Sequence, residues 1–433
     1  MMNEATRQFI RQHLHDDVRQ TALKHGHAHD GVDMPTALRQ IAGWQTACSK
    51  LPSWAAQPEV EYPVHLSMEQ CSSEATAHYK AKVAKQWLQE HCNSGEAPTM
   101  TDLTGGFGVD FTLLAPLFGH ATYVEQDHHL AAIVEHNLQV MLPRGTHALC
   151  ANGIDHLHTM QPVTMLFADP ARRNLHGGRT FAIDDCTPNV KELKPLLMQK
   201  ARMVMLKLSP MLDWRKAVAD MAPWVSQVHL VSVNNECKEL LLVMEHPHQS
   251  LETGGGHAGL RVVCHGERTN GQGLCTGCME EVFDLPSTGS TSVQCERPSM
   301  TQLQRGGLYL YEPDAAWMKA GLFELMEQRH GMSQLSPNSH LFISSTPQHS
   351  FPGRHFALMA ASTLGKDLKQ ALRDVAQANI TVRNFPLSVP DLRKRLKIKE
   401  GGSTFIFATT LHDHTKVLLI CHRIGDGLAE CAP

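Results

Sequence analysis

The stretch Asp102-Leu-Thr-Gly-Gly-Phe-Gly-Val-Asp110 continues a short apolar run at residues 100–103 that predicts a buried β-strand. Glycine has no side chain, so it permits turns and close backbone approaches to a ligand that other residues obstruct. A strand that delivers Asp102 into three closely spaced glycines therefore predicts a nucleotide-binding turn at the end of a parallel sheet. The alternative is an ordinary tight turn with Phe107 facing the core.

The next predicted strand ends in Glu125, whose carboxylate can accept hydrogen bonds from both hydroxyls of a ribose. A dinucleotide-binding turn would carry a third glycine, but Phe111 follows Gly106-Phe-Gly108 at that point. The turn has no lysine for a phosphate, and Asp102 and Asp110 would repel a pyrophosphate while they tolerate a sulfonium. These features favour S-adenosylmethionine over a nicotinamide cofactor.

A third strand, predicted at residues 147–151, is followed by Asn152. The side-chain amide of an asparagine at this point can bind the edge of an adenine, and a plain turn is the alternative. The predicted cofactor-binding residues are Asp102, Thr104, Gly105, Gly106, Gly108, Glu125 and Asn152.

The fourth predicted strand, residues 165–168, leads into Asp169-Pro170 at the sheet edge where open α/β folds bind ligands. Methyl transfer from a sulfonium is a direct displacement that depends on in-line positioning. A carboxylate that holds an amino or hydroxyl nucleophile and accepts its proton is sufficient help. Asp169 and Pro170, which fixes the direction of the chain, are therefore the predicted catalytic residues.

Arg172, Arg173 and Arg179 follow this corner. Guanidinium groups pair with phosphates and stack on bases, so these arginines point to a nucleic-acid substrate. The alternative is a surface ion-pair network with Asp184 and Asp185.

The whole chain has an ordinary globular composition, with 42% hydrophobic and 19% charged residues among 433, and its length predicts about two to four domains. Lys and Arg total 39 against 43 for Asp and Glu, so the net charge does not attract a polyanion. The chain shows no signal peptide or apolar membrane span, and its twelve cysteines are scattered. We therefore expect a cytoplasmic protein with reduced thiols.

Along the chain, apolar stripes first predict helices, including one that begins at a capping box at Ser67 and ends before Asn93. A parallel sheet follows, with residues 228–233 and 240–245 as an antiparallel pair at its edge. Two smaller α/β modules come next. Their predicted elements are strands 260–264, 308–311 and 341–344, helix 366–377, strand 380–383, helix 390–397 and strands 404–410 and 416–421.

The helix predicted at 390–397 is basic, and residues 381–400 hold six Lys or Arg against two acids. Arg393, Lys394 and Arg395 are therefore predicted to contact RNA. A solvated helix face is the alternative.

Together these residues resemble the bacterial class I SAM-dependent methyltransferases that carry a THUMP-like domain. The resemblance spans about residues 60 to 425. The matching sequences are Glu69-Gln-Cys-Ser-Ser-Glu74, 102–110, 123–125, 169–173, 179–180, 185–188, Lys207-Leu-Ser-Pro-Met211, 231–239, Tyr311-Glu-Pro313, 338–341, Phe351-Pro-Gly-Arg354, 384–388 and 407–411.

The resemblance implies an α/β protein with a helical N-terminal region (1–95), a Rossmann-like methyltransferase core (96–250), a ferredoxin-like module (258–348) and a THUMP-like domain (350–425). It also implies a tRNA or rRNA substrate, since THUMP domains elsewhere help to present RNA to modifying enzymes. A methyltransferase of protein or small molecules, and a non-catalytic SAM- or RNA-binding protein, remain alternatives.

The chain departs from relatives that methylate base amino groups, because Ala171 and Arg172 replace the second proline and the ring that stacks on a flipped base. Thr104 stands where the general methyltransferase turn begins with glycine. These differences leave the methylated atom open. We expect no metal site, since Cys264, Cys275, Cys278 and Cys295 contain one tight pair and lack a second at zinc-ribbon spacing.

Overall fold

The computed structural model describes residues 2–25, 31–93, 95–142, 145–172, 183, 186–246, 259–285, 296–365 and 367–428. The chain forms two compact units. The first comprises residues 1–233, 238–262 and 268–276, and the second comprises 234–237, 263–267 and 277–433. The predicted domain boundaries remain predictions.

The first unit begins with helices that pack on a small apolar core of their own, which includes Phe9 and Ile41. A longer helix, α6, follows them and carries Tyr79, Val83 and Trp87 on its buried face, as predicted. Its start differs from the prediction, because Ser73 caps α6 and the segment around Ser67 is a separate short helix. The helices are α1 Glu4–His13, α2 Val18–His25, α3 Met34–Lys50, α4 Pro52–Ala55, α5 His65–Gln70 and α6 Glu74–His91.

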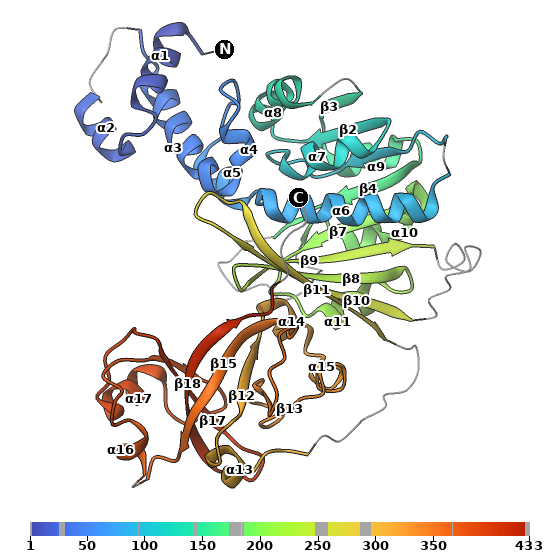
Figure 1. Cartoon of the computed structure of the whole chain (residues 1–433). Helices are drawn as coiled ribbons and strands as arrows, with labels where there is room; N and C mark the ends of the chain where they lie inside the picture. The colour runs from blue at the N-terminus through green and yellow to red at the C-terminus, as the bar shows by residue number, and fades with distance from the viewer. Residues whose placement is uncertain are drawn as a thin grey trace. The chain divides into compact units, whose positions relative to one another are not determined.

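The chain forms a nine-stranded sheet of order β11-β10-β8-β9-β7-β4-β1-β2-β3, and the strands from β8 to β3 are the centre of the first unit (Figure 1). Its parallel strands are β1 Thr99–Asp102, β2 His120–Glu125, β3 Thr146–Cys150, β4 Val163–Ala168 and β7 Ala201–Leu208. Because β1 lies between β2 and β4, the chain departs from it in opposite directions, and such a switch point opens a crevice at the carboxyl ends of the strands.

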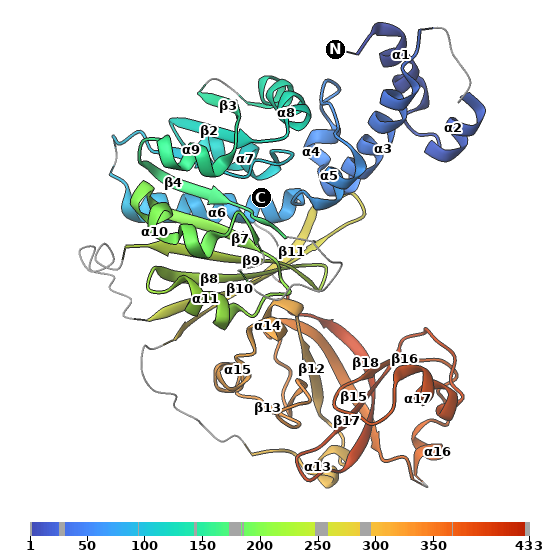
Figure 2. The same ribbon diagram turned by 180° about the vertical axis from the view of Figure 1, so that it is seen from behind.

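Helices cover both faces of this sheet. Helices α6, α7 and α8 share one apolar core with one face. Figure 2 shows α9, α10 and α11 on the other face. The bounds not yet given are α7 Val109–Leu114, η1 Ala115–Leu117, α8 His128–Met141, α9 Gly153–Thr159, α10 Val190–Lys200 and α11 Trp214–Met221, with a small ribbon of β5 Ala171–Arg172 and β6 Cys186–Thr187.

The strands predicted as the edge pair are β8 Val225–Val233 and β9 Glu236–Glu245. Asn234 and Asn235 join them in a two-residue turn with φ values of 53° and 64°. The two strands are neighbours and β9 pairs antiparallel with β7, but the edge assignment was wrong, because two further strands lie beyond β8. The hairpin of β10 Leu260–Thr269 and β11 Cys275–Leu285 extends the sheet further, so the strand predicted at 260–264 does not open a second module.

The second unit contains a seven-stranded sheet of order β13-β14-β12-β15-β18-β17-β16. The two predicted modules share this sheet, because β12 pairs antiparallel with β15. The helix predicted over 366–377 is reduced to the short α16. The elements are α13 Met300–Gln304, β12 Tyr309–Pro313, α14 Ala315–Ala320, α15 Phe323–His330, β13 Ser333–Gln334, β14 Phe342–Ser344, β15 Gly353–Ser362, α16 Leu368–Ala371, β16 Asn379–Val382, α17 Val389–Leu396, β17 Thr404–Thr410 and β18 Lys416–Asp426.

Candidate active site

A cavity of about 780 Å³ opens where the parallel strands of the first unit end. This volume lies within the range of small-molecule sites. Every residue predicted to bind the cofactor lines the cavity, and so do both predicted catalytic residues. These nine are Asp102, Thr104, Gly105, Gly106, Gly108, Glu125, Asn152, Asp169 and Pro170.

The glycines of the turn meet two different requirements. Gly106 and Gly108 have positive φ angles of 54° and 78°, which residues with a side chain rarely adopt. Gly105 lies so close to the sheet that a Cβ atom there would stand 2.0 Å from the ring of Tyr123. The Tyr123 hydroxyl donates to the carbonyl of Gly106, so the ring also supports the turn from below.

Glu125 already binds the turn. Its carboxylate accepts the N–H of Gly106 at 2.9 Å and the N–H of Asp127 at 2.8 Å, one on each oxygen. Each carboxylate oxygen can accept a further hydrogen bond, so both remain able to accept ribose hydroxyls.

Asn152 lines the cavity and also caps a helix. Its side-chain oxygen caps helix α9 by accepting the N–H of Ile154 at 2.9 Å. This is the turn role that the sequence left open as an alternative. The amide nitrogen lies 3.4 Å from the side chain of Gln126, which also lines the cavity.

Asp102 is 1% exposed and accepts the N–H of Thr104 at 3.0 Å. Burial raises its pKa well above the ordinary value, and the acids Asp110, Asp169 and Glu125 add to this effect. A buried acid surrounded by other acids stabilises a nearby cation. The residues of this end of the cavity therefore fit the positive charge and the ribose of S-adenosylmethionine.

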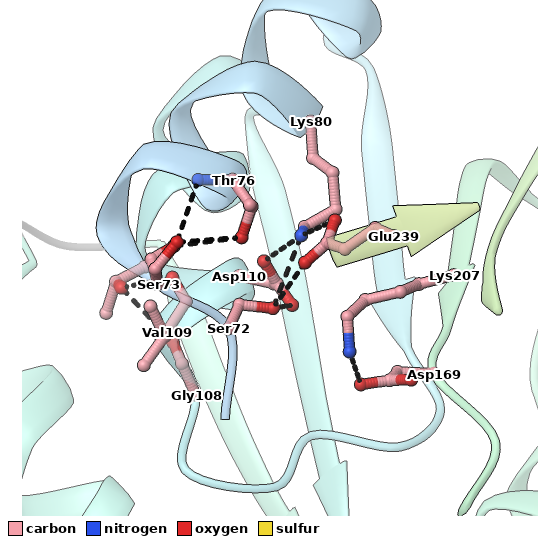
Figure 3. Close-up of polar contacts among 11 residues, drawn as sticks. Ser72, Ser73, Thr76, Lys80, Gly108, Val109, Asp110, Asp169, Lys207 and Glu239 are labelled. Carbon is pink, nitrogen blue, oxygen red and sulfur yellow. Dashed lines mark hydrogen bonds and ion pairs between the residues drawn. The ribbon is translucent and has the colours of Figure 1, made fainter. Parts of the chain in front are cut away.

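Asp169 is fixed from two sides. Its backbone N–H donates to the hydroxyl of Thr104 at 2.6 Å, which ties the aspartyl-prolyl corner to the glycine turn. Its carboxylate accepts a hydrogen bond from Lys207 on the neighbouring strand β7 (Figure 3). Burial lowers the pKa of a lysine, but the carboxylates of Asp169, Glu239 and Asp110 outweigh it and raise the pKa of Lys207 above the ordinary value.

A second lysine, Lys80 of α6, is completely buried beside this pair (Figure 3). Its ammonium lies 3.0 Å from Asp110 and 2.6 Å from Glu239. The hydroxyl of Ser72 donates to Asp110 at 2.7 Å. Burial opposes ionisation of Glu239, but Lys80 and Lys207 lower its pKa below the ordinary value. The part of the cavity around Asp169 and Lys207, its acceptor end, is thus supported by a network of paired charges.

Ser72, Lys80, Lys207 and Glu239 were not among the site residues predicted from the sequence. A signal was available, since Lys207 interrupts the apolar run of β7 and Lys80 lies on the buried stripe of α6. Charged residues are rarely buried unless they are paired.

Of the predicted substrate arginines of the first unit, the structure describes only the backbone of Arg172. Arg172 contributes its backbone to β5, while Arg173, Arg179, Asp184 and Asp185 lie outside the described residues.

The predicted RNA-binding residues lie on α17 of the second unit. Lys394 and Arg395 are exposed, while Arg393 donates to the carbonyl of Ala378 at 3.1 Å.

Within the described ranges, no group of three or more His, Cys, Asp and Glu side chains could hold a metal ion. No described helix is both long and apolar enough to cross a membrane.

Comparison with known proteins supports these observations. Residues 309–352 match a ferredoxin-like domain and residues 353–423 match a THUMP domain-like family. Two curated relatives from strains of Mycobacterium tuberculosis are named uncharacterized S-adenosylmethionine-dependent methyltransferases. Each is 26% identical over 317 residues, which cover 72% of this chain and 76% of the relative.

The crystal structure of a protein from Porphyromonas gingivalis W83, named as a candidate methyltransferase, matches with a TM-score of 0.76 and 27% identity. The match covers 98% of this chain and 100% of that one. The resemblance that the motifs indicated is confirmed: the chain is an S-adenosylmethionine-dependent methyltransferase with ferredoxin-like and THUMP-like domains at its C-terminal end.

Proposed function

We propose that this enzyme methylates a base in tRNA or rRNA, and that Asp169 positions the nucleophilic group. The observation that carries the proposal is that Asp169, tied to Thr104 and to Lys207, lines the same cavity as the glycine turn. Bound S-adenosylmethionine supplies an activated methyl group. The task that remains for the protein is to align a nucleophile with it.

Different residues of the cavity bind the cofactor and position the nucleophile. The glycine turn and Glu125 hold the nucleoside of the cofactor, with Asn152 near its adenine, and Asp102 favours its positive charge. Asp169 accepts a hydrogen bond from the N–H or O–H that is to be methylated, which orients the lone pair of the nucleophile. The proton released by the transfer passes to this carboxylate or to water.

Support for RNA as the substrate comes from the second unit. It carries the THUMP-like domain, and Lys394 and Arg395 expose positive charge on α17. We propose that these two residues, with Arg393 and with Arg172, Arg173 and Arg179 of the first unit, contact the RNA backbone.

A comparison of modified nucleosides in total RNA from cells with and without the protein tests the proposal. We expect one methylated nucleoside to disappear without it. Purified protein should then transfer labelled methyl groups to the unmodified RNA, with an affinity that falls steeply as salt rises, because binding releases counterions from phosphates. Label that enters protein or small molecules instead would contradict an RNA substrate. Cofactor binding with no transfer to any cell fraction would indicate a binding protein.

A further inference from the structure

Lys207 has hydrogen-bonding capacity that no group of the described residues uses. Its side chain is 14% exposed, and it lines the cavity. An ammonium group carries three N–H donors. Among the described residues one hydrogen-bond acceptor is found for it, the carboxylate of Asp169 (Figure 3). Two donors of a largely buried charge are therefore left for groups that enter the cavity.

Such donors are not left unpaired at equilibrium, because a buried polar group without a partner is costly. The ammonium also persists at neutral pH, since the carboxylates around it raise the pKa of Lys207. Lys207 therefore remains a donor and does not act as a base. Water can accept these N–H groups in the ligand-free protein, and a bound substrate can replace that water.

We infer that Asp169 and Lys207 act together as a recognition pair for the acceptor substrate: Asp169 accepts the N–H that is to be methylated, and Lys207 donates to the acceptor atom beside it. This inference rests on the proposed function and narrows it. The substrate group would be the edge of a neutral nucleobase, where an N–H donor stands next to a ring nitrogen or a carbonyl oxygen.

The charges of the pair support a neutral ligand. Asp169 and Lys207 cancel each other, and Lys80 is matched to Asp110 and Glu239 deeper in the protein. A phosphate or carboxylate would face the carboxylate of Asp169, and an ammonium would face Lys207. A lone hydroxyl would use one member of the pair and leave the other unsatisfied.

The chemical step balances with these roles. The bond between the methyl carbon and sulfur breaks as the bond between that carbon and the base nitrogen forms. The nitrogen then loses one proton to Asp169 or to water. Lys207 keeps its proton throughout, so its effect is on the orientation and binding of the base.

The first test removes the donor while it keeps the length of the side chain. Lys207→Met should lower kcat/KM for the unmodified RNA by about 100-fold, because a site built for a hydrogen bond discriminates strongly when one partner is missing. The dissociation constant for S-adenosylmethionine should change by less than about threefold. Lys207→Arg, which retains charge and donors, should keep more activity than Lys207→Met. Equal activity of Lys207→Met and the parent would overturn the inference.

Lys191 offers a matched control. It also pairs with an aspartate, Asp220, at 2.9 Å, but it lies on α10 and does not line the cavity. Lys191→Met should leave transfer and cofactor binding unchanged. Thermal midpoints of all variants separate loss of folding from loss of recognition, and a loss of transfer that follows the midpoint alone would contradict a recognition role.

The decisive test alters the substrate. Once the product nucleoside is known, RNA is made with the acceptor atom beside the methylated nitrogen replaced by C–H. The parental enzyme should lose about as much kcat/KM on this RNA as Lys207→Met loses on natural RNA, and Lys207→Met should lose little more. If the loss from Lys207→Met and the loss from the altered RNA add up when the two are combined, Lys207 does not bind the altered atom. That result would overturn this inference and leave the proposed methylation of RNA intact. If the parental enzyme methylates no RNA, the proposed function fails and this inference fails with it.

Discussion

The two ends of the cavity are built in different ways. The cofactor end is formed mainly by backbone groups within residues 102–110 and by Glu125, which closes the next strand. The acceptor end is lined by side chains from distant elements, Asp169 after β4 and Lys207 on β7, and the buried Glu239 of β9 lies beside them. The difference shows that a local turn can be recognised from spacing, whereas a network of paired side chains depends on the tertiary fold.

Charge also separates the two ends. Asp102 at the cofactor end has no lysine or arginine partner among the described residues, and Glu125 binds backbone N–H groups. At the acceptor end, Lys207 pairs with Asp169, while Lys80 pairs with Asp110 and Glu239. The cofactor end thus has carboxyl groups with no cation of their own, which a cationic ligand can pair with, while the acceptor end neutralises its own charges before a base arrives.

The strongest test of this division is Asp169→Ala. Loss of the carboxylate that orients the nucleophile should reduce transfer roughly a thousandfold, as expected for a positioned acid–base group. Binding of S-adenosylmethionine should weaken by less than about threefold, because the turn and Glu125 remain. Calorimetry and a single-turnover transfer assay measure the two effects separately. Transfer at the parental rate would show that Asp169 is misassigned. A loss of cofactor affinity as large as the loss of transfer would show that the two ends of the cavity do not have separate roles.

The residues predicted for the cofactor end all line one cavity, and they could be chosen from the sequence because each signal there is local. Gly108 lies in the left-handed region, and Glu125 lies where the strand spacing indicated. The partners of Lys80 could not be predicted, since a helical stripe reports which face is buried and not what a lysine on that face contacts. The place of β9 inside the sheet was also missed, because strand order depends on long-range pairing that apolar patterning does not encode.

A smaller effect is expected from Gly105→Ala at the cofactor end. The added Cβ would stand 2.0 Å from the buried ring of Tyr123, so the ring must move and its bond to Gly106 must break. Overpacking of this kind costs about 1–3 kcal/mol. We expect a lower thermal midpoint and cofactor binding weakened by up to about 100-fold.

Gly106→Ala is the matched control, because the nearest atom to its added Cβ is 3.8 Å away and the remaining penalty is its positive φ. It should lower the thermal midpoint of the empty protein less than Gly105→Ala does. Equal losses in the two variants would mean that contact with Tyr123 is not what requires glycine at residue 105.

The smallest effect concerns Asp102, whose pKa burial raises well above the value of 3.8 for a free side chain. The folded, empty protein therefore holds a proton on this carboxyl that the unfolded chain releases, so this group's contribution to stability falls as pH rises above 3.8. A cationic ligand favours the ionised form, so affinity for S-adenosylmethionine should rise with pH until Asp102 is ionised in the free protein.

Asp102→Asn tests both consequences, since an amide oxygen can still accept the N–H of Thr104. At pH 7 to 8 the ligand-free variant should have a higher thermal midpoint than the ligand-free parent, by roughly 2–4 °C for each kcal/mol added to the free energy of unfolding. It should also bind S-adenosylmethionine about tenfold more weakly and lose the pH dependence of binding, because it has no charge to offer the sulfonium. A variant that melts lower than the parent and keeps the parental pH profile would show that Asp102 is ionised and paired in the empty protein. The acidic character of the cofactor end would then have to come from Glu125.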